Sequence, residues 1–217
     1  AVPTTLVLRD RAGQIATADA EHAGVEPVRD ALQAQKALLA HAHLQLRAQH
    51  GRADNATALA AERATAEKHL GALARNLASQ PAMKEAAEHV HELQELLKPP
   101  AQGAQGAEAL LERHALTQTT LADVVLHLAD GAGLTLDPVA GSYFLMTAVT
   151  EHLPHQAALT AGVRDHLLVA RTDKGADIDR AVLREQLEQL GHARERATAQ
   201  LEKALAAESV LAARLKP

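Results

Sequence analysis

Cysteine and tryptophan are absent from this 217-residue chain, and aromatic residues make up only 1% of it, the single tyrosine and phenylalanine being Tyr143 and Phe144. Without cysteine, a disulfide framework and thiolate chemistry are excluded. Apolar residues still make up 47%, so the core must consist mainly of leucine, valine and alanine. Alanine is the strongest helix former, whereas strands favour β-branched and aromatic residues, so this composition predicts an all-α protein.

Several functional signatures are also missing. No run approaches the roughly 20 apolar residues that cross a bilayer, and no signal peptide is visible. The net charge of −5 comes without a long basic run, so no nucleic-acid partner is expected. No phosphate-binding loop, dinucleotide fingerprint, nucleophile elbow or HExxH motif occurs, so we expect neither enzyme activity nor a cofactor. The chain begins without Met, which fits a piece of a longer protein.

Leucine and alanine recur with helical spacing along the whole chain, and glycine or proline interrupts the pattern. Pro81 and the pair Pro99-Pro100 should each end a helix, because proline lacks the backbone N–H. An irregular segment is expected at 130–141, and Pro154 should kink the helix that follows it. The pattern predicts helices over about 4–50, 55–80, 83–97, 107–128, 142–171 and 177–215.

Helix length then predicts the architecture. At about 1.5 Å per residue, the first and last helices each span on the order of 60–70 Å. The simplest assembly is an elongated bundle in which these two helices are shared by two stacked four-helix bundles, with both termini at one end. Residues 1–217 then form one domain. Its distal module covers about 30–80 and 140–195, and its membrane-proximal module covers about 1–30, 83–131 and 195–217.

One motif resembles a known receptor family. His114 is followed sixteen residues later by Asp130, then by Leu134-Thr-Leu-Asp137-Pro138 and by Ser142-Tyr143-Phe144-Leu145-Met146. This order is similar to the LxLDPDxDSYYLM pattern of helical bimodular sensor domains in bacterial chemoreceptors and sensor histidine kinases. The chain departs from that pattern at Val139 and Gly141, where the family-like motif is acidic, and at His41-Ala42-His43, where the pattern reads HRG.

The resemblance implies a function and a location. It implies a periplasmic sensor domain of a membrane-anchored receptor, such as a methyl-accepting chemotaxis protein, that acts as a homodimer. It also implies a small-molecule ligand, often an organic acid, whose binding displaces the long helices. The alternative is a structural helical spacer without a ligand. A spacer would profit from an unbroken apolar seam, which this chain lacks.

His114 and Thr117 are the most informative candidate site residues. They interrupt an apolar stripe that continues through Leu121 and Val124, so the sequence places polar side chains at core positions. Burying an imidazole without a partner costs roughly 1–3 kcal/mol, so either a core partner or a ligand must satisfy it. His41 lies on an apolar stretch of the first helix and could face His114.

The helix start after the irregular segment is the second candidate. Ser142 is a natural N-cap, and a helix N-terminus inside a bundle can hold an anion. Asp137 and Ser142 could instead only cap the loop, with Tyr143 filling the bundle. We expect one anion-binding site where the fourth helix breaks, lined by His114, Thr117, Tyr143, His41, Ser142 and Asp137. No metal site is expected, because Pro154 interrupts the only EHxxH-like patch, at 151–155.

Overall fold

The computed structural model describes residues 2–49, 56–80, 83–98, 106–136, 139–172 and 180–214, and this part of the chain is helical without strands. The all-α prediction is confirmed. The α-helices are α1 (Val2–Gln49), α2 (Ala56–Leu77), α3 (Lys84–Leu97), α4 (Ala107–Gly131), α5 (Ala140–Thr147), α6 (Leu153–Thr172), α7 (Arg180–Ala207) and α8 (Ser209–Arg214). A short 3-10 helix, η3 (Leu134–Leu136), follows α4, and a π turn, η4 (Ala148–His152), joins α5 to α6.

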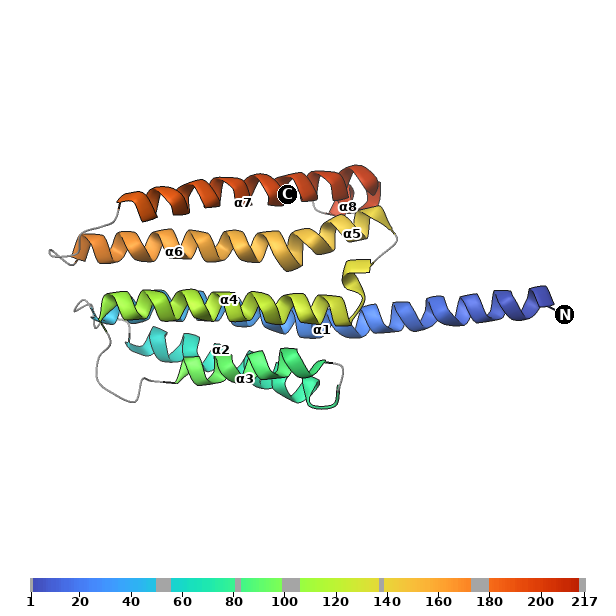
Figure 1. The fold of residues 1–217 in the computed structure, drawn as a ribbon, viewed down its shortest axis with the longest axis horizontal. Helices are drawn as coiled ribbons and strands as arrows, with labels where there is room; N and C mark the ends of the chain where they lie inside the picture. The colour runs from blue at the N-terminus through green and yellow to red at the C-terminus, as the bar shows by residue number, and fades with distance from the viewer. Residues whose placement is uncertain are drawn as a thin grey trace.

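The main core lies between the first four helices. α2 and α3 form an antiparallel pair along one side of α1 and α4 (Figure 1). Each helix contributes leucine, valine or alanine at helical spacing, as the composition predicts. The largest fully buried side chains of this core are Leu70, Leu73, Val90, Leu93, Leu121, Val124 and Val125.

The stacking of two four-helix bundles is not confirmed. The sequence analysis placed 30–80 and 83–131 in different modules, but both ranges contribute to this one core. The physical reason is the direction of α3. This helix returns alongside α2 and does not continue beyond the end of α2 (Figure 1), so α2 packs on α1 while α3 packs on α4 beside it.

The helices α5, α6 and α7 form a further layer on the opposite side of α1 and α4 (Figure 1). α7 packs chiefly against α5 and α6, so it is the outermost helix. A small apolar cluster of Leu46, Leu110 and Val169 links α6 to α1 and α4. Large apolar side chains such as Leu187 on α7, 50% exposed, remain open to solvent.

The interruption expected at Pro154 is present as the π turn η4, which ends two residues before this proline. Proline cannot donate a backbone hydrogen bond, and a single π turn is a common way to accommodate such a gap. The carbonyl of Pro154 accepts a hydrogen bond of 3.0 Å from Nε2 of the buried Gln35 on α1. The interruption in this helix therefore also joins it to α1.

The ends of the chain lie apart in Figure 1. α7 runs toward the end of the molecule at which α1 enters the body, but α1 projects well beyond it and α8 folds back. The start of α1 and the last described helix, α8, therefore do not lie close together, contrary to the expectation that both ends of the chain lie at one end of the bundle. None of the helices that the structure describes combines the length and the apolar character needed to cross a membrane.

Candidate functional site

A cavity of about 380 Å³, called cavity A here, lies between α1, α2, α4 and the C-terminal end of α3. His41 and His114 both line it, so these two histidines lie beside the same space. Thr117 also lines it and is 8% exposed. Its Oγ1 donates a hydrogen bond of 2.8 Å to the carbonyl of Arg113, so the buried hydroxyl is already satisfied within α4.

The imidazole of His114 is only partly satisfied. Its Nε2 lies 3.3 Å from Oε1 of Gln45 on α1, and because an amide oxygen can only accept, Nε2 donates. Its Nδ1 is buried and has no hydrogen-bond partner in the described part of the chain. A neutral imidazole that donates through Nε2 carries a lone pair on Nδ1, so this atom can accept a hydrogen bond from a ligand.

Both histidines are neutral near pH 7. Burial lowers the pKa of His114 to about 4, and the nearby Asp165 carboxylate offsets this only in part. Burial likewise lowers the pKa of His41 to about 4, and the positive charges of Arg63 and Arg113 lower it further. These two histidines therefore add no positive charge to cavity A near pH 7.

Permanent cations supply the positive potential instead. Arg63, Lys98 and Arg113 line cavity A, and no Asp or Glu is among the described residues that line it. Arg113 also caps α3, because its guanidinium donates to the carbonyls of Leu96 and Lys98 near the end of that helix. Its charge is thereby held in place beside His114.

The remaining predicted site residues lie elsewhere. α4 continues for about 25 Å beyond His114 before it ends at Gly131, so the break in the chain is distant from the cavity. Tyr143 is 40% exposed and packs edge-to-face on Phe144, with ring centroids 5.4 Å apart. Ser142 is not an N-cap, because α5 already begins at Ala140 after Val139. Asp137 lies outside the described residues.

A second cavity of about 380 Å³, called cavity B, lies between α1, α4 and α6 and reaches Gln186 on α7. His114, Ala42 and Gln118 line both cavities, so the two spaces lie on either side of a shared wall. Alanine is the commonest residue in the walls of cavity B, and leucine also lines them. Among its described lining residues Asp165 is the only Asp or Glu, and neither Lys nor Arg lines it.

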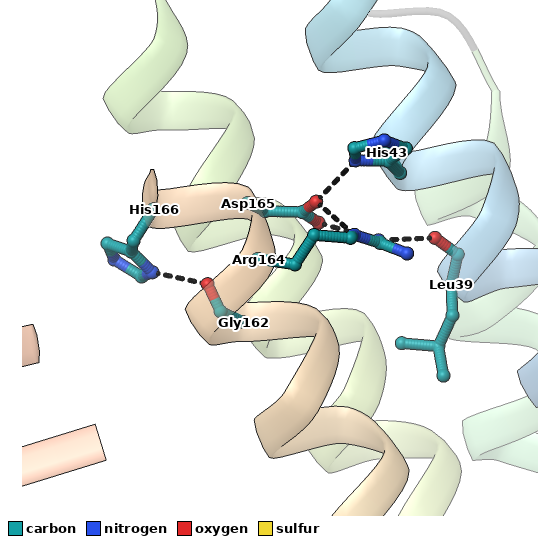
Figure 2. A network of polar contacts seen from close by, with 6 residues as sticks. All are labelled: Leu39, His43, Gly162, Arg164, Asp165 and His166. Atoms are coloured by element: carbon teal, nitrogen blue, oxygen red, sulfur yellow. Dashed lines mark hydrogen bonds and ion pairs between the residues drawn. The ribbon is translucent and has the colours of Figure 1, made fainter. Parts of the chain in front are cut away.

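A polar network joins α6 to α1 beside cavity B (Figure 2). The Asp165 carboxylate, 4% exposed, lies 2.8 Å from Nδ1 of His43 and accepts a hydrogen bond of 2.9 Å from Nε of Arg164. Arg164 also donates to the carbonyl of Leu39 on α1 at 3.1 Å. The Nδ1 atom of His166 lies 2.8 Å from the carbonyl of Gly162, so Nδ1 donates and Nε2 carries a lone pair.

Metal chemistry finds no support in this part of the molecule. Within the described ranges, no group of three or more histidine or carboxylate side chains is placed to hold a metal ion.

Sequence reasoning missed the cations of cavity A, although Arg113 directly precedes His114. The sequence offered one indication of these cations. Arg113 is adjacent to His114, a polar residue at a core position of α4, and its long side chain reaches the cavity that His114 lines.

Comparisons with known proteins give no family. No protein-family model matches the chain, and no match was found among the curated proteins or the solved structures. The likeness to helical bimodular sensor domains therefore rests on the sequence motif alone.

Proposed function

We propose that the protein is a ligand-binding sensor domain whose cavity A takes a small organic anion. The observation that carries this proposal is the lining of cavity A, which combines three cations with no carboxylate among the described residues. An anion in such a partly enclosed space is held by charge-assisted hydrogen bonds, which are stronger than neutral ones. The unpaired Nδ1 of His114 adds an acceptor for a ligand hydroxyl.

The receptor context is part of the same proposal. The motif around His114 and Tyr143 supports a periplasmic domain of a membrane-anchored chemoreceptor or sensor kinase. That this domain consists of two stacked helical modules remains a hypothesis. Homodimerisation is proposed through the long helices α1 and α7, where Leu187 leaves apolar surface exposed. A ligand can signal only if it binds two arrangements of these helices with different affinity.

The test is a binding screen at pH 7 and low salt. Thermal melts followed by circular dichroism would compare acetate, succinate, citrate and benzoate with succinamide, a neutral control. We expect at least one carboxylate to raise the melting temperature and to give saturable heat in calorimetric titration. If no carboxylate binds, the sensor proposal fails, and the structural spacer becomes the better description.

Two variants assign the binding to cavity A. Arg63→Gln removes a cation whose surface ion pair with Glu67, 2.8 Å long, contributes little to stability. Ala60→Leu fills the cavity from an exposed position on α2. Each should weaken carboxylate binding at least tenfold. Ala115→Leu, at an exposed position that lines cavity B only, is the matched control and should change it less than twofold.

A further inference from the structure

Cavity B differs from cavity A in the chemistry of its lining. Asp165 is its one formal charge among the described residues, whereas cavity A carries three cations. The two cavities have similar volumes and share a wall, so they differ chiefly in the charge of the residues that line them. A ligand suited to one is therefore poorly suited to the other.

Three polar residues that line cavity B offer hydrogen-bond acceptors. Oε1 of Gln186 is buried and has no hydrogen-bond partner among the residues that the structure describes. Nδ1 of His166 donates to the carbonyl of Gly162, so Nε2 is the acceptor of this ring in its neutral form. The Asp165 carboxylate completes the set. An unpaired buried acceptor costs free energy, so a molecule with several N–H donors is the natural occupant.

Arg164 offsets only part of the negative potential of Asp165 in this space, although its guanidinium donates to both carboxylate oxygens. Its guanidinium lies against Asp165 but does not line cavity B, and it is directed toward α1 (Figure 2). At His114, in the wall of the cavity, Asp165 acts on the pKa more strongly than Arg164 does. Burial and the charge of Arg196 lower the pKa of His155, so this lining histidine adds no positive charge near neutral pH.

We propose that cavity B is a second ligand site, separate from the anion site of cavity A, which takes a small aliphatic amine in its ammonium form. The alkyl chain lies against the apolar side chains, chiefly Leu39, Leu111 and Leu159. The ammonium group donates to the Asp165 carboxylate and to Oε1 of Gln186. This assignment does not depend on whether cavity A binds an anion.

The probe is butylammonium, titrated calorimetrically in an amine-free buffer at pH 7 and compared with butanol and butyrate. These three molecules share the alkyl chain and differ in the charge of the head group. We expect saturable binding of butylammonium and at least tenfold weaker binding of butanol. Butyrate should give no saturable heat in the Ala60→Leu variant, in which cavity A is filled. Equal binding of butanol and butylammonium would overturn the ammonium assignment.

Variants locate the amine. Ala115→Leu fills cavity B from an exposed helical position, and Gln186→Leu removes the unpaired acceptor; each should weaken butylammonium binding at least tenfold. Ala60→Leu fills cavity A in the same way and should change the amine affinity less than twofold. Circular dichroism would verify that all three variants fold. A loss of amine binding in Ala60→Leu but not in Ala115→Leu would overturn the assignment of the amine to cavity B. If butylammonium shows no saturable binding at all, the amine proposal is wrong, and the test of cavity A is unaffected.

Discussion

The Nδ1 atom of His43 on α1 lies 2.8 Å from Oδ1 of Asp165 on α6, and this contact joins two layers of helices that share little apolar core. The Asp165 side chain is 5% exposed, and the Arg164 guanidinium also binds it. The small apolar cluster around Leu46 and these polar contacts both link α6 to α1. The position of the outer layer therefore depends on a buried carboxylate.

We expect Asp165→Ala to destabilise the protein by about 2–4 kcal/mol, because it leaves His43 and Arg164 without their acceptor in a partly buried site. Urea unfolding at pH 7, followed by circular dichroism, measures this change. The control is Glu26→Ala, which breaks the exposed pair with Arg29 and should cost no more than about 0.5 kcal/mol. Similar small losses in both variants would contradict a structural role for Asp165.

Acid should destabilise the protein through His41 and His114. Burial lowers the pKa of both to about 4, below the value near 6.5 in an unfolded chain. Because the folded state resists protonation, this stability is complete above about pH 6.5 and is lost as the pH falls from there toward 4. Each histidine contributes a loss of at most about 3 kcal/mol.

The measurement is the free energy of unfolding between pH 7.5 and 4.5. The double variant His41→Leu/His114→Leu should show a much flatter decline over this interval, because it removes both groups. An unchanged decline would mean that other titrating groups dominate the acid response of the protein.

The sequence could predict the helices because their signals are local. Alanine content, leucine spacing and the positions of Pro81 and Pro154 act within a few turns, and the described helices follow them closely. The end of the last long helix was an exception. A continuous helix was expected over about 177–215, but α7 ends at Ala207 and α8 turns back against the body (Figure 1).

The candidate site could be predicted only in part, because helix pairing depends on distant contacts. The stripe on α4 was enough to identify His114 and Thr117 as unusual core positions. Nothing in that stripe indicated that α3 returns beside α2, and this return brings Lys98 and the end of α3 to cavity A. Tyr143 was assigned to the site because it follows α4 in the sequence, but α4 carries it far from His114.

The crossing of α1 and α4 should depend on Gly24. A Cβ atom at this position would lie 2.1 Å from Cβ of Ala132, so Gly24→Ala must push the helices apart. We expect a loss of about 1–3 kcal/mol in urea unfolding, the usual cost of overpacking. Gly191→Ala on the exposed side of α7 is the matched control. Its Cβ meets nothing within 4 Å, so it should raise stability by up to about 1 kcal/mol through helix propensity. Equal effects at both positions would contradict the close approach.

Replacing His114 by leucine separates a ligand-binding histidine from a structural one. The imidazole makes one long contact, to Gln45 at 3.3 Å, and leaves Nδ1 buried without a partner in the described structure. Leucine removes this unsatisfied atom and keeps an apolar side chain of similar size, so the melting temperature of the empty domain should stay the same or rise. Stabilisation by citrate, whose hydroxyl can donate to Nδ1, should weaken in this variant, because that hydroxyl loses its hydrogen-bond acceptor in cavity A. A strong fall in the melting temperature of the empty domain would instead make His114 a structural residue of the core, and the assignment of the anion site to this histidine would then be wrong.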